Sequence, residues 1–306
     1  MKAAVLREGN KNLVIEDIPI PEPGAGEVLV KVAACGVCQT DLHYIDHGIP
    51  TQKKPPMILG HEISGIVTAT GQRVLLLPIF CDNRIMLGNT IDGGFAEYVK
   101  VPEEAVIPLP DEIPLEEGCI IADAVSTPYH AVMNRAKVKP TDKVIVFGCG
   151  GVGMNVVQIS AMLGAEVTAC DIDENKLEIA KELGAAYTVK PDQINTKYDV
   201  AFEVIGKPET IEAAFKTLGK AGRLCVIGYT NQNITINPAK IMFFEQEIIG
   251  SIGCRIGDYS KIFKLVIDGK IKLDKLIANK YRLEGINKAL DELRKSKVLR
   301  NIILLS

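Results

Sequence analysis

Residues 143–153 read KVIVFGCGGVG, an apolar run that leads directly into a turn rich in glycine. The first five residues have the apolar, β-branched composition of a buried strand. After the turn, apolar residues recur at helical spacing from Val152 to Leu163, and Gly164 ends that pattern. A strand, a glycine turn and a helix in immediate succession predict one βαβ unit of a parallel sheet.

The glycine turn has the spacing G-x-G-x-x-G, with its three fixed positions at Gly148, Gly150 and Gly153. The first glycine permits a tight turn, the second the close approach of a phosphate, and the third the packing of helix on strand. The N–H groups of the turn, with Gly151 and Val152 at its centre, and the helix N-terminus can bind a pyrophosphate. The pattern predicts a dinucleotide site rather than a plain glycine-rich connection.

The strand predicted at residues 166–170 is followed by Asp171, close to the ~20 residues after the turn at which the ribose-binding carboxylate is expected. A carboxylate there accepts hydrogen bonds from the adenosine ribose and repels a 2′-phosphate. Asp173 and Glu174 add negative charge near the same place. Lys176, which we also predict to bind the cofactor, adds a positive charge and argues mildly for NADP. We therefore expect NAD rather than NADP.

From about Ala124 onward, apolar strands alternate with helical stretches, which predicts a doubly wound α/β sheet. One further helix is predicted from Asp173 to Gly184 and another from Pro208 to Gly219. Earlier in the chain, short β-rich runs separated by Pro and Gly predict a compact all-β domain. These runs are residues 13–18, 27–35, 63–69, 73–77 and 94–101. The last fifty residues turn to amphipathic helices at 262–267 and 286–293 and a final strand at 301–305, which could rejoin either domain.

Length and composition describe an ordinary globular chain of 306 residues with 47% hydrophobic residues, and two domains are the default expectation. The net charge of -3 and the lack of a basic run give no reason to expect nucleic acid. Without an apolar signal core or a run of ~18 apolar residues, no membrane association is expected, and we predict a soluble, cytoplasmic protein. Of eight cysteines, Cys149, Cys170, Cys225 and Cys254 lie in or beside apolar runs and are interpreted as core residues.

Residues 35–43, CGVCQTDLH, and residues 60–62, GHE, resemble the zinc-dependent medium-chain alcohol dehydrogenases. The runs GGFAEY at 93–98 and DVAFEVIG at 199–206 extend this resemblance over almost the whole chain. The resemblance implies a GroES-like β domain, completed by the C-terminal segment, packed against a Rossmann domain with the active site in the cleft. We expect the GroES-like catalytic domain at residues 1–123 and 256–306 and the NAD-binding domain at residues 124–255.

The same resemblance implies a zinc ion bound by Cys38, His61 and Asp123, with Glu62 as the acidic neighbour behind the metal. Many relatives have a cysteine where this chain has Asp123, and some have an aspartate. One thiolate and one carboxylate offset the charge of Zn²⁺ as two thiolates would, and the fourth position stays open for substrate.

A metal with an open position lowers the pKa of a bound hydroxyl, so that hydride can leave for the nicotinamide. By resemblance, Thr40 and His43 form the proton relay, with His43 passing the proton outward through the ribose hydroxyls. Two further matched positions are Thr127, near the nicotinamide, and Arg300, at the cofactor pyrophosphate. A helix-start hydroxyl and a surface charge are the structural alternatives for these two residues.

The chain departs from the family pattern between Pro78 and Asp92, where many relatives bind a second, structural zinc through four cysteines. Only Cys81 is present here, and a single thiolate cannot build a closed four-ligand site. We therefore expect one catalytic zinc per chain and no structural zinc. The link from Thr68 to Arg73 is also unusually short.

The preferred function is reversible, NAD-dependent oxidation of a primary or secondary alcohol, or a small polyol, to the carbonyl compound. One alternative is a zinc-free reductase of enones or quinones on the same fold, and another is a non-catalytic NAD(H)-binding redox sensor. Relatives pair through sheet edges, so we expect a homodimer or homotetramer, for which the apolar run 248–252 is a candidate edge. His47 and His130 receive no role.

Overall fold

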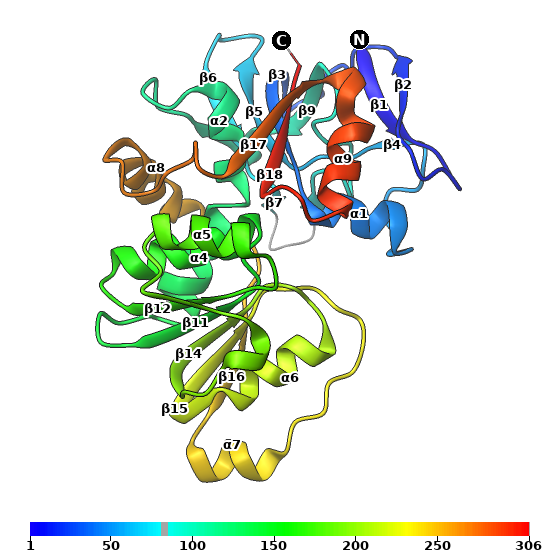
Figure 1. The fold of residues 1–306 in the computed structure, drawn as a ribbon. Coiled ribbons are helices and arrows are strands. Elements are labelled where there is room, and N and C mark those ends of the chain that lie inside the picture. The colour runs from blue at the N-terminus through cyan, green and yellow to red at the C-terminus, as the bar shows by residue number, and fades with distance from the viewer. Residues whose placement is uncertain (81–84, 306) are drawn as a thin grey trace. The chain divides into compact units, whose positions relative to one another are not determined.

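A computed structural model describes residues 1–80 and 85–305, and the chain divides into two units (Figure 1). Unit 1 comprises Met1–Ala124, Tyr259–Ile267 and Leu273–Ser306, and unit 2 comprises Val125–Asp258 and Asp268–Lys272. Within the described ranges, we find no helix with the length and apolar character that crossing a bilayer requires.

The strands of unit 1 are β1 (Lys2–Leu6), β2 (Val14–Asp17), β3 (Glu27–Val37), β4 (Met57–Ile58), β5 (Glu62–Val67), β6 (Arg73–Leu76), β7 (Ile79–Phe80), β8 (Ile85–Met86), β9 (Tyr98–Pro102), β10 (Val106–Pro108), β17 (Ile277–Arg282) and β18 (Arg300–Leu304). Its helices are α1 (Gln39–Asp46), η1 (Glu103–Ala105), α2 (Leu115–Gly118), η2 (Cys119–Ala122), α8 (Tyr259–Ile267), η6 (Leu283–Gly285) and α9 (Ile286–Arg294).

The strands of unit 2 are β11 (Lys143–Phe147), β12 (Glu166–Cys170), β13 (Tyr187–Val189), β14 (Tyr198–Glu203), β15 (Leu218–Val226) and β16 (Glu247–Gly250). Its helices are α3 (Ser126–Tyr129), η3 (His130–Arg135), α4 (Gly151–Met162), α5 (Glu174–Glu182), η4 (Pro191–Gln193), α6 (Pro208–Lys216), α7 (Pro238–Phe244) and η5 (Ile256–Asp258).

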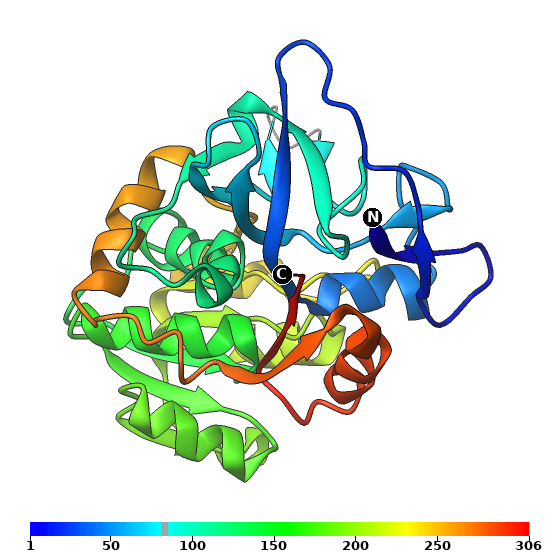
Figure 2. The ribbon, with the colours of Figure 1, turned by 90° about the horizontal axis from the view of Figure 1, so that it is seen from above.

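The long strand β3 organises unit 1. It pairs antiparallel with β5, β9 and β18, and the main sheet has the order β10-β6-β5-β3-β18-β17. The second half of β3 is buried without interruption, as expected for a strand covered on both faces. The final strand β18, drawn in red, runs beside β3 (Figure 2). The C-terminal segment therefore joins the sheet of unit 1.

The register of β3, β5 and β18 places polar residues of three strand ends side by side. Gly36 of β3 pairs with Glu62 at the start of β5, and Val37 of β3 pairs with Asn301 of β18. Cys38 follows β3 directly, and Arg300 precedes Asn301. Residues far apart in sequence thus lie at neighbouring positions because the strands that carry them are hydrogen-bonded.

Unit 2 is a parallel sheet in the order β13-β12-β11-β14-β15-β16 (Figure 1). This is the 3-2-1-4-5-6 order of doubly wound, dinucleotide-binding sheets, in which the strand order reverses at β11. Ile145, Phe147 and Ala201 of the sheet pack with Ile211 and Phe215 of α6 in one buried cluster. The predicted doubly wound α/β architecture is therefore confirmed.

The helices of unit 2 begin close to the predicted positions, but one ends earlier than predicted. Asp173 caps α5 by accepting a hydrogen bond from the Asn175 N–H, and Gly184 takes a left-handed φ of 104° just beyond the helix. The prediction that the next helix continues to Gly219 is wrong. Helix α6 stops at Lys216, and Gly219 already belongs to β15, whose pairing with β14 begins at Leu218.

The cysteines of unit 2 divide into core residues and one exception. Cys149, Cys170 and Cys225 are buried, and burial raises the pKa of Cys170 and of Cys225 to about 12, so these thiols stay protonated and inert. The core interpretation of Cys254 is wrong, because its side chain is only partly buried. It lies beyond β16, where the apolar strand has already ended.

Candidate metal and cofactor sites

Four ligand-type side chains of unit 1 converge at the row of strand ends. Cys38 Sγ, a His61 ring nitrogen and carboxylate oxygens of Glu62 and Asp123 all lie within 4.8 Å of one another. Over residues 1–80 and 85–305, no second cluster of three or more metal-binding side chains accompanies it. The three predicted ligands and the predicted acidic neighbour are therefore brought together.

The spacing of these atoms suits a metal ion better than direct bonding. His61 Nε2 lies 3.4 Å from Asp123 Oδ2, and Cys38 Sγ lies 3.8 Å from the same oxygen. A tetrahedral zinc with bonds of about 2.0 Å to nitrogen and about 2.3 Å to sulfur holds neighbouring ligand atoms about 3.3 to 3.6 Å apart. The first of these distances falls within this range and the second lies just above it, so the donor types and their spacing fit a zinc ion.

The buried polar atoms of the cluster point to the same conclusion. Both ring nitrogens of His61 and Oε2 of Glu62 are buried without a hydrogen-bond partner. Leaving such groups unpaired costs roughly 1–3 kcal/mol each. Burial opposes a charge on His61, yet the facing Asp123 carboxylate and Cys38 thiol raise its pKa well above the ordinary value. The site therefore attracts positive charge.

Asp41 was missed by the sequence analysis, although it lies three residues after Cys38. Its side chain is completely buried and accepts hydrogen bonds from the Cys38 N–H (2.9 Å) and the Gly60 N–H (3.2 Å). Its Oδ1 lies 3.8 Å from His61 Nδ1. A carboxylate behind a metal-binding histidine fixes the ring and strengthens the ligand. An acidic residue in the first turn after a ligand cysteine was the available signal.

Glu62 is held on the side of the cluster that faces β18. Its Oε1 accepts a hydrogen bond from the Ala124 N–H (2.9 Å) and lies 3.5 Å from Arg300 Nη2. Burial raises the pKa of Glu62 to about 7, although the positive Arg300 lowers it. A Cβ at Gly36 would overlap with the Glu62 carboxylate, so glycine at this position lets the carboxylate approach β3.

Arg300 is a buried residue of unit 1, with 3% of its surface exposed. Besides facing Glu62, it donates a hydrogen bond to the Val37 carbonyl (3.0 Å). The alternative of a plain surface charge is therefore wrong. Its contact with a cofactor pyrophosphate stays a prediction.

The loop that carries Asp123 is anchored from the C-terminal part of unit 1. Asp123 follows η2, a short helix whose four residues are buried. The Tyr259 hydroxyl donates a hydrogen bond to the Ala122 carbonyl (2.9 Å), and Tyr259 is itself buried. The backbone just before the predicted third ligand is therefore fixed by α8.

The two predicted relay residues lie on α1, which starts directly after Cys38. Thr40 Oγ1 is 3.7 Å from Cys38 Sγ in the first turn, and His43 follows one turn later. His43 Nδ1 lies 2.9 Å from His47 Nδ1. Burial and the neighbouring His47 lower the pKa of His43, so its ring is neutral and can accept a proton at neutral pH.

In unit 2 the glycine turn follows the central strand β11. Gly148 has a φ of 97°, which only glycine adopts readily, and a Cβ at Gly153 would overlap with the Gly148 carbonyl oxygen. A Cβ at Gly150 would meet no atom within 4 Å, so the space in front of this residue is open. Gly151 and Val152 form the first turn of α4. The turn thus has the shape that a bound pyrophosphate requires.

Asp171 lies beside this turn at the end of β12. Its carboxylate accepts hydrogen bonds from the Cys149 N–H (2.7 Å) and the Asp173 N–H (3.0 Å). Lys176 is half-buried in α5, and Thr127 is buried in α3 with 7% of its surface exposed. The contacts of these residues with NAD stay predictions.

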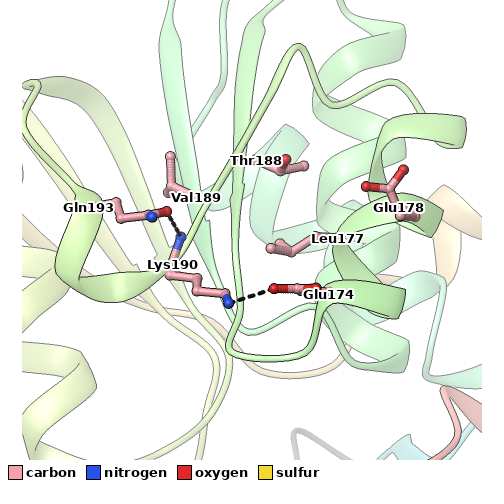
Figure 3. A pocket seen from close by; sticks show the side chains of 7 residues that line it. All are labelled: Glu174, Leu177, Glu178, Thr188, Val189, Lys190 and Gln193. Carbon is pink, nitrogen blue, oxygen red and sulfur yellow. Dashed lines mark hydrogen bonds and ion pairs between the residues drawn. The ribbon is translucent and has the colours of Figure 1, made fainter.

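A shallow hollow of about 270 Å³ lies on unit 2 between α5 and β13 (Figure 3). Across it, Lys190 Nζ pairs with Glu174 Oε1 at 2.6 Å. It is lined by Glu174, Leu177, Glu178, Thr188, Val189, Lys190 and Gln193. Its volume falls below the ~300 Å³ at which ligand pockets begin, and the predicted cofactor residues are not part of its lining.

Known families and proteins resemble the chain along its whole length. Residues 24–111 match the alcohol dehydrogenase GroES-like domain, and residues 151–268 match the zinc-binding dehydrogenase family. The chain is 30% identical to an alcohol dehydrogenase of Geobacillus stearothermophilus, with 99% of each chain covered. It is also 30% identical to the (R,R)-butanediol dehydrogenase of Bacillus subtilis, with 94% of each covered.

A solved structure gives the same result for the fold. The acetophenone reductase of Geotrichum candidum, determined in complex with NAD, superposes with a TM-score of 0.89 at 28% identity. The match covers 99% of this chain and 96% of that one. Both parts of the predicted fold, the GroES-like part and the Rossmann part, therefore have counterparts in a known oxidoreductase.

Proposed function

Because the chain belongs to the zinc-dependent medium-chain dehydrogenase/reductase family, we propose that it oxidises an alcohol reversibly with NAD. The observation that carries this proposal is the buried group of Cys38, His61, Glu62 and Asp123, in which both nitrogens of His61 lack a partner. The substrate class is a primary or secondary alcohol, or a small polyol, and the product is the aldehyde or ketone. The names of the butanediol and acetophenone relatives support secondary alcohols and ketones within this class.

We assign the catalytic domain to residues 1–123 and 256–306 and the NAD-binding domain to residues 124–255. The division of the chain into units after Ala124 and Asp258 supports this assignment. The glycine turn and Asp171 would hold NAD in unit 2, and Cys38, His61 and Asp123 would hold zinc in unit 1.

When bound, zinc would act as a Lewis acid toward the substrate hydroxyl, and NAD would accept the hydride. Thr40, whose Oγ1 lies 3.7 Å from Cys38 Sγ, hydrogen-bonds the substrate hydroxyl. The neutral His43 accepts the proton that this hydroxyl loses. The buried Asp41 carboxylate, 3.8 Å from His61 Nδ1, would orient the His61 ring toward a bound metal. Glu62 lies beside the donors, where Arg300 balances its charge.

We propose one catalytic zinc per chain and no structural zinc. The chemical support is the single cysteine, Cys81, between Pro78 and Asp92. Cys81 itself lies outside the described residues. A closed structural site needs four ligands, of which thiolates are the usual donors.

We further propose a homodimer or homotetramer that forms through the edge strand β16. Ile248 is 43% exposed on this edge, and Ile252 just beyond it is 63% exposed. Helix α7 adds the exposed side chains of Met242 and Phe243. An uncovered apolar sheet edge is a strong candidate for pairing with a second copy. Light scattering of the purified protein measures the assembly directly.

A cytoplasmic location completes the proposal. None of the seven cysteines among the described residues forms a disulfide, including Cys35 and Cys38, which are close in sequence. Free thiols are typical of reducing compartments, whereas secreted proteins tend to form disulfides. Localisation of the tagged protein in cells tests this point.

The function is tested with a panel of alcohols, aldehydes and ketones, each assayed with NAD and NADP, alongside metal analysis of the purified protein. We expect NAD-dependent turnover of at least one alcohol and about one zinc per chain. Full activity in a metal-free preparation would favour the enone or quinone reductase. NADH binding without turnover of any substrate would favour the non-catalytic redox sensor.

A further inference from the structure

His43 and His47 form a pair of imidazole rings at the end of α1. Their Nδ1 atoms are 2.9 Å apart, and their ring centroids are 5.1 Å apart with a tilt of 49°. At this distance one Nδ1 donates a hydrogen bond and the other accepts it. The facing nitrogens of the two rings therefore share one proton.

The helix places these rings together. His43 and His47 are four residues apart, a spacing that puts side chains on the same helix face. The His47 N–H donates to the His43 carbonyl at 3.3 Å, and Gly48 then takes a left-handed φ of 65° that ends the helix. His47 thus lies where the backbone leaves the helix.

The two histidine rings differ in their exposure to solvent. His43 is half-buried, whereas His47 is exposed to solvent. The shared hydrogen bond therefore joins a half-buried ring to one in contact with bulk water, which gives a proton on His43 a path outward.

The charged groups near the pair form ion pairs with one another. Asp46, on the same helix, forms an ion pair with Arg294 of α9 at 2.6 Å, and Arg294 also binds Asp291 at 2.5 Å. Arg294 thus gives both carboxylates a cationic partner, which weakens their competition for a proton held by His43 or His47.

Two further titratable groups of α1 have partners of their own. The Tyr44 hydroxyl donates to the Met86 sulfur at 3.6 Å, and burial raises its pKa. The buried Asp41 carboxylate is bonded to the N–H groups of Cys38 and Gly60. The hydrogen-bonded His43–His47 pair is thus the route on this helix through which a proton can pass.

We propose that His47 is the outer member of the proton relay and carries the proton of alcohol oxidation from His43 to solvent. The inference rests on the proposed function. His43 takes the proton on its other ring nitrogen and releases its Nδ1 proton to Nδ1 of His47. His47 then gives a proton to water, so one proton reaches solvent and both rings end neutral. Tautomer exchange through solvent restores the starting state.

His47 acts through His43 and is therefore a positioning residue, so its test needs a readout that a structural role would not change. The experiment compares wild type, His47→Gln, His43→Gln and the double variant, each with confirmed zinc content and melting temperature. In dilute buffer at pH 6.5 we expect kcat of His47→Gln to fall about tenfold, with KM little changed. Added imidazole buffer should restore kcat in this variant and leave wild type unaffected.

The double variant separates a relay from two independent effects. If His47 acts through His43, the loss caused by His47→Gln disappears when His43 is already Gln. A second readout is independent of turnover, because ¹⁵N NMR titration of the histidine rings measures the pKa of His43. The positive charge of a protonated His47 lowers that pKa, so we expect it to rise in His47→Gln.

Three kinds of result would contradict the proposed role of His47. Unchanged kcat, no response to imidazole and an unchanged His43 titration in His47→Gln would overturn the relay. Additive losses in the double variant would also overturn it, because they show that His47 acts independently of His43. If wild type oxidises no alcohol, the proposed function itself fails, and the relay fails with it.

Discussion

The zinc cluster of unit 1 and the glycine turn of unit 2 are built in opposite ways. The cluster uses side chains at Cys38, His61 and Asp123, which distant strands and loops bring together. The turn uses the backbone of six consecutive residues from Gly148 to Gly153, and four of them are glycines without a side chain. The zinc cluster depends on the tertiary fold, whereas the glycine turn is formed by a single continuous segment of the chain.

This difference determines how each site responds to change. Loss of a metal ligand leaves buried polar atoms uncompensated, because both ring nitrogens of His61 and Oε2 of Glu62 already lack a hydrogen-bond partner in the protein. A backbone site fails only when a side chain fills the space that the ligand or the turn needs. We therefore expect a substitution in one site to abolish binding there and to leave binding at the other site intact.

The largest expected effect is from Cys38→Ala. We expect loss of zinc and at least about a thousandfold loss of alcohol oxidation, because the thiolate is one of three predicted ligands. NADH binding should persist, since the glycine turn belongs to unit 2. Metal analysis and fluorescence titration with NADH measure the two sites separately. Cys225→Ala in the core of unit 2 is the matched control and should retain zinc; a Cys38→Ala protein that keeps its zinc contradicts the ligand assignment.

The reciprocal change is Gly153→Ala. The added Cβ overlaps with the Gly148 carbonyl oxygen, so the turn must open and NADH binding should weaken about a hundredfold, or about 2.7 kcal/mol. Zinc content should not change. Gly257→Ala is the control, because a Cβ there meets no atom within 4 Å. Unaltered NADH affinity in Gly153→Ala would show that the turn is not the cofactor site.

Asp41→Asn tests whether the cluster depends on residues behind the ligands. The substitution keeps the size of the side chain but removes the charge beside His61 Nδ1. Zinc affinity, measured by competition with a chelator, should fall about 10–100-fold. Asp46→Asn on the same helix serves as control, because Asp46 pairs with Arg294 instead. Equal zinc affinity of the two variants would refute the supporting role of Asp41.

Asp171→Gly should have the smallest effect of the four. The preference for NAD over NADP, as a ratio of kcat/KM values, should fall about tenfold, because the carboxylate no longer repels a 2′-phosphate. Asp192→Gly, a substitution in η4, provides a control for the loss of one negative charge. Equal use of NADP by the unmodified protein would show that Asp171 does not select the cofactor.

The sequence predicted the local features of unit 2 well, because each depends on neighbouring residues. The strand before Gly148, the helix after it and the cap at Asp173 follow from periodicity and turn chemistry. The end of α6 was misjudged because Gly219 looks like a helix stop, whereas pairing with β14 draws the chain into a strand from Leu218. Strand pairing is a long-range interaction that local spacing does not contain.

In unit 1 the candidate site could be predicted only through the family resemblance. Nothing near Asp123 in the sequence indicates that it lies 3.4 Å from His61. The contact between His43 and His47 has a helical spacing, but the sequence alone does not tell which i,i+4 pairs form hydrogen bonds. The burial of Arg300 beside Glu62 depends on the register of β18 with β3, which no short motif encodes.

The position of β18 has a consequence for how the protein is made. This strand lies inside the main sheet, between β3 and β17, yet unit 2 is synthesised after β3 and before β18. At roughly 5–20 residues per second, synthesis takes tens of seconds to pass from Glu62 to Arg300. During that interval the Glu62 carboxylate lacks the Arg300 guanidinium beside it, and β3 lacks its hydrogen-bonding partner β18. The nascent catalytic unit therefore completes its main sheet only after β18 has been synthesised, while the parallel sheet encoded in between can fold first.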